Sequence, residues 1–280
     1  MEVISAVAEL KRRVGEARQA GRTVGLVPTM GALHAGHLSL VDRACRECDF
    51  VVVSIFVNPT QFNNPDDLRT YPRTLDADVA LLEGRTRADV AFAPTVAEVY
   101  PRPDTRVFQL GAVAEVMEGP RRPGHFNGVC QIVSKLFAYV SPDKAFFGEK
   151  DFQQIAVIRE MVRRCDFKIE IVACPIVREP DGLALSSRNT LLTPSHRAEA
   201  PLIHKVLEES RAKKNEMPPA RLVEWVVGQV DASELLKVEY FEIVDALSLQ
   251  PVGDWAETEA PVGCVTVQAG DVRLIDNIIY

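Results

Sequence analysis

The sequence has no apolar run long enough to cross a bilayer and no excess of basic residues. Its 280 residues include 32 Lys and Arg against 39 Asp and Glu, which gives a formal net charge of -7 at pH 7. A spanning helix needs about 20 apolar residues, and an acidic chain is a poor partner for nucleic acid or for an anionic membrane surface. We therefore expect small molecules as partners, with no nucleic acid and no membrane.

Cysteine is also scarce, with 6 in the chain. Cys130 and Cys174 lie among apolar residues, which is typical of buried reduced thiols rather than of a secreted disulfide framework. Cys45 and Cys48 form a C-x-x-C late in a predicted helix, away from the helix N-terminus where a thiolate would be stabilised. Residues 1–20 have the spacing of an amphipathic helix rather than of a signal peptide. We expect a cytoplasmic protein.

Strands and helices alternate along the first part of the chain. The run FVVVSIFV at 50–57 is apolar and β-branched, as in a strand that is buried on both faces. Further strands are predicted at 23–28, 88–93, 144–147 and 168–173, with helices after His37 and at 75–84, 126–140 and 151–164. This β-α-β series predicts an α/β fold, a Rossmann-like doubly wound parallel sheet with right-handed crossovers, over residues 1–176.

The pattern changes after about residue 175. Two helices are predicted at 194–213 and 219–230, and three strands follow at 237–244, 263–269 and 272–278. Prolines between residues 175 and 180 mark a boundary that can act as a hinge. We therefore expect a smaller α+β C-terminal domain, residues 177–280, that covers the active site.

The segment VPTMGALHAGHLSLV at 27–41 leads from a predicted strand directly into a helix. A helix N-terminus offers unpaired backbone N–H groups and a partial positive charge, and glycine lets a polyanion approach them. His34 and His37 are three residues apart, so they share one face of the first turn. A zinc site is the weaker interpretation, because no third ligand has suitable spacing. The segment predicts phosphate binding.

Polar residues also follow the other predicted strands. They are Asn58 and Gln61 after 50–57, the block 148–151 after 144–147, and the block 184–189 after 168–173. Because the carboxyl ends of parallel strands open at one edge, these groups are expected to line one crevice. A lining of His, Lys, Arg and Ser suits a triphosphate and the charge that develops in phosphoryl or nucleotidyl transfer. No Walker A sequence is present, which excludes a P-loop enzyme.

Six blocks in order resemble the pantothenate synthetase (pantoate–β-alanine ligase) family of the HxGH nucleotidyltransferase superfamily. They are PTMGALHAGH, SIFVNPTQF, YPRT, RPGHFNGV, FGEKDFQQ and LSSRN, and they extend over essentially the whole chain. The resemblance implies ATP-dependent condensation of (R)-pantoate with β-alanine to pantothenate through a pantoyl adenylate, with release of AMP and pyrophosphate. It also implies ATP as co-substrate, Mg²⁺ as cofactor, and a homodimer.

Two other functions remain open at this point. A related adenylyltransferase would share the H-x-G-H block but keep the nucleotide on its product. A nucleotide sensor would need no uncharged amide side chains positioned to bind an acid substrate. Gln61, Gln154 and the FGEKDFQQ block favour the ligase over both.

The resemblance also implies residue roles around the nucleotide. A carboxylate has to attack the α-phosphorus of ATP although both partners are negative, so the site must neutralise charge and align the reactants. The catalytic residues are His34, His37, Lys150 and Arg188. The ATP-binding residues are Met30, Gly31, His34, His37, Gly148, Glu149, Lys150, Asp151, Val177, Leu185, Ser186, Ser187 and Arg188.

The remaining roles concern the acid, the amine and the metal. Gln61 and Gln154 are amides that can donate hydrogen bonds to pantoate without adding charge, although a loop cap and a solvated helix residue are the alternatives. Asn58 is expected to help place β-alanine. The magnesium ligands are unknown, and Asp78 is a weak candidate because it equally fits a capped helix. The family also has a flap near the phosphates, here Glu118, Arg122 and His125.

Overall fold

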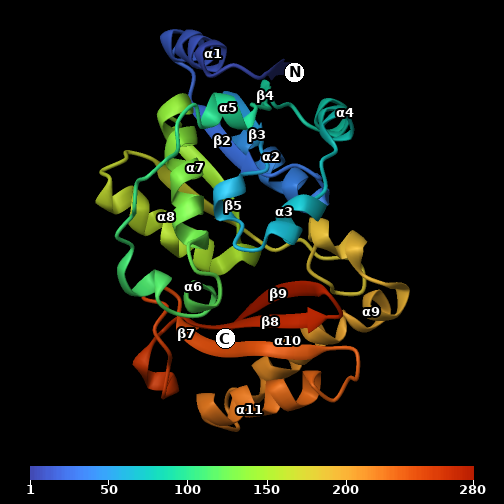
Figure 1. Ribbon diagram of the computed structural model, residues 1–280. Coiled ribbons are helices and arrows are strands. Elements are labelled where there is room, and N and C mark those ends of the chain that lie inside the picture. Colours follow the sequence, from blue (N-terminus) through green and yellow to red (C-terminus); the bar gives the residue numbers. More distant parts are fainter. The chain divides into compact units, whose positions relative to one another are not determined.

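Six parallel strands form the larger sheet of the computed structural model, which describes residues 1–280 (Figure 1). The strands are β1 (Glu2–Ile4), β2 (Val24–Thr29), β3 (Phe50–Ile55), β4 (Val90–Phe92), β5 (Lys144–Gly148) and β6 (Glu170–Cys174). Their order is β1-β4-β3-β2-β5-β6. The strands β3 and β4 lie on one side of β2, and the later strands β5 and β6 lie on the other. The topological switch point is therefore between β2 and β5. The predicted Rossmann-like sheet is confirmed.

Both faces of this sheet are covered, which explains why its strands are apolar at consecutive positions. Val27, Val53 and Phe146 form one buried cluster with the apolar side of α2 (Ala35–Glu47). On β4, Ala91 joins that cluster, whereas the ring of Phe92 meets Tyr139 of α7 (His125–Val140) edge to face, with 6.4 Å between ring centroids. Successive strand residues therefore reach opposite faces.

Two predicted helices differ from the structure. Residues 1–20 are not one helix: the first residues form β1, which pairs with β4 and buries Ile4, and α1 (Val7–Gln19) follows. The predicted helix 194–213 is interrupted, giving α9 (Pro194–Glu199) and α10 (Leu202–Lys213). Pro201 lies between them, and its missing amide hydrogen prevents one continuous helix.

The other helices of the chain are mostly close to the predicted ranges. Three short ones, α3, α5 and α6, lie in segments for which no helix or strand was predicted. The bounds are α3 (Pro65–Thr70), α4 (Leu75–Arg85), α5 (Val96–Val99), α6 (Glu118–Arg121), α8 (Phe152–Arg164) and α11 (Pro219–Val230). Short 3-10 helices include η1 (Pro59–Gln61), η3 (Glu149–Asp151) and η4 (Ser187–Leu191).

The chain divides into two compact units. The sheet unit comprises residues 1–110, 121–149 and 157–175, and the C-terminal unit comprises residues 111–120, 150–156 and 176–280. The C-terminal unit contains an antiparallel sheet in the order β7-β8-β9, from β7 (Lys237–Asp245), β8 (Pro261–Ala269) and β9 (Val272–Ile279). Helices α10 and α11 pack with this sheet around a core that includes Leu207, Val226 and Phe241 (Figure 1). The smaller α+β part is therefore confirmed.

A buried ion pair attaches segment 111–120 to the β-sheet of the C-terminal unit. Arg273 on β9 binds both oxygens of Glu118, with Nη1–Oε2 and Nη2–Oε1 distances of 2.6 and 2.7 Å. Tyr240 donates its hydroxyl hydrogen to the same carboxylate at 2.8 Å. Such a bidentate, charge-assisted pair fixes both distance and orientation. It explains why a segment that precedes α7 in the sequence packs with strands near the C-terminus.

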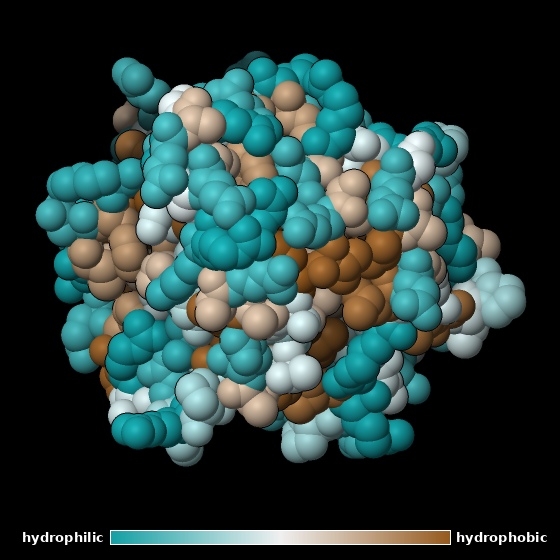
Figure 2. All heavy atoms as spheres, turned by 90° about the horizontal axis from the view of Figure 1, so that it is seen from above, coloured by the Kyte–Doolittle hydropathy of each residue, from teal (hydrophilic) through white to brown (hydrophobic).

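The face seen in Figure 2 is formed mostly by hydrophilic residues around a central patch of apolar ones. None of the helices combines the length and the apolar composition that crossing a membrane requires.

Candidate active site

The loop between β2 and α2 has an unusual backbone that a distant aspartate stabilises. Gly31 and Ala32 both have positive φ, 81° and 50°. Asp78, which is 2% exposed, accepts hydrogen bonds from the backbone N–H groups of Ala32 at 2.9 Å and Leu33 at 2.8 Å. Thr74 donates its hydroxyl hydrogen to the same carboxylate at 3.2 Å. The first turn of α4 therefore holds the segment that leads to the two histidines.

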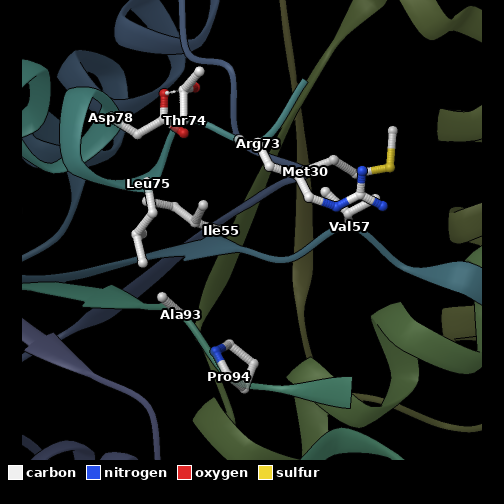
Figure 3. Close-up of a pocket in the computed structure, with 10 residues that line it drawn as sticks. Met30, Ile55, Val57, Arg73, Thr74, Leu75, Asp78, Ala93 and Pro94 are labelled. Atoms are coloured by element: carbon white, nitrogen blue, oxygen red, sulfur yellow. Dashed lines mark hydrogen bonds between the residues drawn. The ribbon is translucent and has the colours of Figure 1, made fainter. Parts of the chain in front are cut away.

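Glycine at position 31 is required by this arrangement. A Cβ atom there would lie 2.9 Å from Asp78 Oδ2 and 3.1 Å from Ile55 Cγ2, and the φ angle is strained for other residues. Asp78 and Gly31 also line a cavity of about 140 Å³ at the carboxyl ends of β2, β3 and β4. Figure 3 shows the Thr74–Asp78 hydrogen bond on one side of this cavity, with Met30 and Arg73 on another.

The expected magnesium role of Asp78 receives no support from these contacts. Both carboxylate oxygens already accept hydrogen bonds from the protein. The structure gives Asp78 a positioning role, and magnesium binding by this residue stays an untested prediction. No group of three or more His, Cys, Asp or Glu side chains is arranged to hold a metal ion.

His34 and His37 begin α2 as a reciprocal cap. The Nδ1 atom of His34, the N-cap residue, accepts a hydrogen bond from Gly36 N at 3.2 Å, and Nδ1 of His37 accepts one from His34 N at 3.3 Å. The rings lie 4.1 Å apart between centroids, tilted by 39°. Because Nδ1 is the acceptor in both rings, each neutral imidazole carries its hydrogen on Nε2. Both Nε2 atoms are therefore donors beside the positive end of a helix.

Gln61 ends η1, which follows β3, and its side chain is held by Asn58. Asn58 is 1% exposed, and its Nδ2 donates to Gln61 Oε1 and to the Gly128 carbonyl oxygen, both at 3.1 Å. Tyr100 donates its hydroxyl hydrogen to Asn58 Oδ1 at 2.8 Å. Asn58 is thus buried behind Gln61, and its expected contact with β-alanine stays a prediction.

Two features of α7 fix the backbone that carries Gln61. Gly128 allows very close packing, since a Cβ atom there would lie 2.2 Å from the Thr60 carbonyl oxygen. His125 Nδ1 lies 2.8 Å from the Gln61 carbonyl oxygen, and Arg122 Nη1 lies 3.0 Å from His125 Nε2. The guanidinium can only donate, so His125 accepts at Nε2 and donates from Nδ1 to Gln61. Arg122 and His125 therefore support the segment that carries Gln61.

In the C-terminal unit, two adjacent residues of β9 connect the expected phosphate-binding segments. Asp276 pairs with Arg178, with Nη1–Oδ2 and Nη2–Oδ1 distances of 2.6 and 2.9 Å. Asn277 Nδ2 donates to the Lys150 carbonyl oxygen at 3.3 Å. Lys150 and the segment that begins near Val177 therefore attach to neighbouring positions of one strand.

A tight hairpin brings Val177 next to Leu185 in this unit. Leu185 N donates to the Val177 carbonyl oxygen at 3.0 Å, and residues 178 and 184 form an antiparallel bridge. Ser186 follows directly and caps η4 by accepting a hydrogen bond from Arg188 N at 3.2 Å. The structure therefore gathers Val177, Leu185 and the Ser186–Arg188 turn into one local site.

Helix α8 places its two glutamines differently. Gln153 is buried and bonds to Glu118 N and to the carbonyl oxygens of Val113 and Val116. Gln154 is half-buried, and its expected contact with pantoate stays a prediction. The carboxylate of Glu118 is 12% exposed and is bound by Arg273, and its expected place near the phosphates stays a prediction.

The C-x-x-C pair shows no sign of reactive thiols. Cys45 lies near the end of α2, and Cys48 is its C-cap residue. Burial raises the pKa of Cys45 and raises that of Cys48 to about 11. High thiol pKa values oppose formation of the nucleophilic thiolate.

Each unit thus collects a set of the expected residues. The sheet unit has Met30, Gly31, His34 and His37 after β2, Asn58 and Gln61 after β3, and Gly148 and Glu149 at β5. The C-terminal unit has Lys150, Asp151, Gln154, Val177 and residues 185–188. Four supporting residues were not predicted from the sequence, namely Tyr100, Gly128, Asp276 and Asn277. Of these only Gly128, a glycine inside a predicted helix, carried a recognisable sign of close packing.

The chain is similar to known proteins along nearly its whole length. The family model for pantoate-beta-alanine ligase matches residues 2–279. A pantothenate synthetase of Porphyromonas gingivalis is 59% identical over 280 residues, covering 100% of this chain and 99% of that protein. One from Bacteroides fragilis is 56% identical with the same coverage.

Solved structures extend the similarity. Pantothenate synthetase from Thermus thermophilus superimposes with a TM-score of 0.93 at 43% identity, covering 99% of both chains. Pantoate-beta-alanine ligase from Francisella tularensis, complexed with beta-gamma ATP and beta-alanine, has a TM-score of 0.83 at 34% identity, with 100% of this chain and 97% of that one covered.

Proposed function

The chain belongs to the pantoate–β-alanine ligase family, and we propose how its residues divide the work of that reaction. The reaction condenses (R)-pantoate with β-alanine using ATP. A related adenylyltransferase that retains the nucleotide on its product is not favoured, because the family match covers residues 2–279. The proposal concerns which side chains bind each reactant and how the intermediate forms.

The geometry of the two histidines is the observation that carries this proposal. Their Nδ1 atoms accept backbone hydrogen bonds, so both rings direct an Nε2–H donor away from the helix backbone. The pair begins α2 directly after β2, at the switch point of the sheet, where α/β proteins bind nucleotides. We assign His34 and His37 to the phosphates of ATP, where they stabilise negative charge in the transition state. Met30 and Gly31 border the nucleotide, together with Gly148 and Glu149.

Pantoate is assigned to Gln61 and Gln154. Oε1 of Gln61 accepts a hydrogen bond from Asn58, so its Nε2 faces the other way and can donate to an acid. Amides add no positive charge, so the carboxylate keeps its nucleophilic character. Asn58 supports this amide, and its direct help in placing β-alanine remains part of the proposal.

We assign the cationic and hydroxyl groups of the C-terminal unit to ATP as well. Lys150 and Arg188 neutralise charge while a carboxylate oxygen of pantoate attacks the α-phosphorus and the bond to the β-phosphate breaks. Ser186 and Ser187 donate hydrogen bonds to the leaving pyrophosphate. Asp151, Val177 and Leu185 contact the nucleotide. The local hairpin that joins the last two residues supports this assignment.

The second step needs no covalent enzyme intermediate. The neutral amine of β-alanine attacks the acyl carbon of pantoyl adenylate, the bond to the phosphate oxygen breaks, and AMP leaves. The amine loses one proton as the amide forms. Holding the two reactants together supplies most of the rate increase for such a step.

Further parts of the proposal concern magnesium, assembly and location. Mg²⁺ in nucleotide sites is held largely by phosphates and water with one or two carboxylates. We propose that Mg²⁺, when bound with ATP, would supply positive charge to its phosphates. We also propose a cytoplasmic homodimer. Val107, 74% exposed in a segment outside both sheets, is a candidate contact in that dimer.

Isotope transfer tests the proposed intermediate. Pantoate labelled with ¹⁸O in its carboxylate should transfer one labelled oxygen to AMP during complete turnover, because the attacking oxygen stays on phosphorus. Label in inorganic phosphate, or none in AMP, would refute the pantoyl adenylate. Sedimentation of the wild type and of Val107→Asp tests the dimer, which should dissociate in the variant.

A further inference from the structure

We propose that Tyr100 and Asn58 form a hydrogen-bonded relay that orients the amide of Gln61, so that it selects an acid over the corresponding amide. This inference rests on the assignment of Gln61 to pantoate made above. Toward pantoate, Tyr100 and Asn58 act as positioning residues, since neither needs to touch this acid. All members of the relay lie in the sheet unit.

The orientation of the Asn58 side-chain amide is fixed by a backbone carbonyl oxygen. The Gly128 carbonyl oxygen can only accept, so the Asn58 atom 3.1 Å from it must be the donor Nδ2. The other atom of that amide, Oδ1, then faces Tyr100 and Thr60, whose hydroxyl oxygens lie at 2.8 and 3.2 Å. Both hydroxyls can donate to it. Asn58 therefore has one consistent arrangement, at a position only 1% exposed.

This arrangement determines how Gln61 is turned. Asn58 Nδ2 has a second hydrogen, which reaches Gln61 at 3.1 Å and requires an acceptor there. The Gln61 atom at that place is therefore Oε1, and Nε2 faces the opposite way, 3.1 Å from the sulfur of Met30. Met30 belongs to the loop that leads to the histidines. The amide thus presents N–H hydrogens toward the side where the nucleotide-binding loop lies.

Tyr100 is suited to be the first donor of the relay. Burial raises the pKa of its hydroxyl, so the group keeps its hydrogen at neutral pH. The ammonium of Lys135 lies 5.0 Å from the centre of its ring, which holds the ring in place through a cation–π contact. Phe56 packs on it as well, with ring centroids 6.3 Å apart. The hydroxyl is therefore fixed against Asn58 by packing on its own ring.

The consequence is a preference between two nearly identical ligands. A carboxylate offers only acceptors, so it pairs only with the N–H side of the Gln61 amide, whereas a primary amide of the same shape has an acceptor and a donor and can pair with either side. If Gln61 presented its oxygen instead, a carboxylate would lose a hydrogen bond and gain repulsion. Holding the N–H group toward the ligand therefore favours pantoate over pantoamide, and a variant that turns Gln61 over lowers that preference.

The test compares equilibrium binding of pantoate and pantoamide by calorimetry in the wild type and in relay variants. Tyr100→Phe removes one hydrogen bond and should lower the preference for pantoate by roughly three- to tenfold. Asn58→Asp removes the N–H donor that faces Gln61 Oε1, so the Gln61 amide rotates and directs its oxygen to the ligand. The preference for pantoate over pantoamide should then fall by about tenfold or more. ATP binding should stay unchanged in both.

Tyr139→Phe is the matched control. It removes a phenolic hydroxyl of the sheet unit whose bond, to the Val99 carbonyl oxygen at 3.5 Å, lies outside the relay. Its preference for pantoate should equal that of the wild type. If Asn58→Asp does not fold, Tyr100→Phe alone carries the test.

Gln61→Ala distinguishes failure of the relay from failure of the assignment of Gln61 to pantoate. Weaker pantoate binding in Gln61→Ala, together with an unchanged preference in Tyr100→Phe, would overturn the relay alone. Unchanged pantoate binding in Gln61→Ala would overturn the assignment of Gln61 and the relay with it. A reduced preference in Tyr100→Phe but not in Tyr139→Phe would support the relay.

Discussion

The carboxylate of Asp78 accepts a hydrogen bond from the backbone N–H group of Ala32, 46 residues away in the sequence, at 2.9 Å. Ala32 has a positive φ of 50°, which is unfavourable for a residue with a side chain. The bond therefore stabilises a backbone turn that the chain would otherwise avoid. That turn directs the next residues into the helix that begins at His34.

We expect Asp78→Asn to impair catalysis although the side chain keeps its size. The new NH₂ group has to face the N–H group of either Ala32 or Leu33, so one hydrogen bond becomes a repulsion. The free energy of unfolding should fall by about 1–3 kcal/mol. The misplaced histidines should lower kcat/KM for ATP by about 10- to 100-fold.

Asp76→Asn is the control, since Asp76 lies in the same helical turn but is exposed. It should match the wild type in steady-state kinetics and in urea unfolding. Equal kcat/KM values for Asp78→Asn and Asp76→Asn would show that Asp78 does not position the loop.

Gly128→Ala should weaken pantoate binding. A methyl group on α7 would lie 2.2 Å from the Thr60 carbonyl oxygen, so the segment that carries Gln61 has to move. We expect the KM for pantoate to rise by roughly tenfold or more, since small displacements cost large factors. Gly84→Ala has no atom within 4 Å of the new Cβ and should be neutral or stabilising by up to about 1 kcal/mol. A normal KM in Gly128→Ala would refute the close packing.

Arg273→Ala should destabilise the protein strongly. It leaves the carboxylate of Glu118, 12% exposed, without its bidentate partner. Loss of one member of such a pair lowers the free energy of unfolding by about 3 kcal/mol, measured by chemical denaturation. Arg221→Ala breaks a pair whose side chains are 71% and 65% exposed, and it should change stability by less than about 1 kcal/mol. Similar effects of both variants would contradict the anchoring role of Arg273.

Asp104 should contribute to the acid sensitivity of the fold. Hydrogen bonds from Arg106 lower the pKa of its carboxyl from 3.8 to about 2. A lowered folded-state pKa stabilises the protein above pH 4, and this contribution disappears as the pH falls from about 4 to about 2. Asp104→Asn should therefore lose about 2 kcal/mol near pH 6 and little near pH 2.

Urea unfolding at several pH values measures this difference. The exposed Asp271→Asn provides the comparison, with stability close to that of the wild type at every pH. A constant difference between Asp104→Asn and the wild type from pH 6 to pH 2 would show that titration of Asp104 has no part in the acid sensitivity.

The fold could be predicted from local patterns because parallel strands covered on both faces are apolar without interruption. The run at 50–57 is such a case, and β3 occupies most of it. The places where a helical pattern is broken were harder to predict. Pro201 ends one helical stretch and precedes another, and β1 occupies residues that also fit a helical pattern, where pairing with β4 decides the outcome.

The histidine pair of the candidate site could be predicted because its residues are close in sequence. His34 and His37 share one helical turn, and local chemistry explains both. The residues that support the site are distant: Gly128 lies 70 positions from Asn58, and Asp78 lies 46 from Ala32. Hydrogen bonds between such positions depend on the tertiary fold, and a single sequence contains no local pattern that reports them.

Pyrophosphate exchange tests the central claim most directly, namely that residues after the sheet strands activate an acid as its adenylate. Labelled pyrophosphate should enter ATP in the presence of pantoate without β-alanine. Exchange should be lost in His37→Ala and in Lys150→Ala, with circular dichroism unchanged. Absence of exchange in the active wild type, or normal exchange in both variants, would contradict the account.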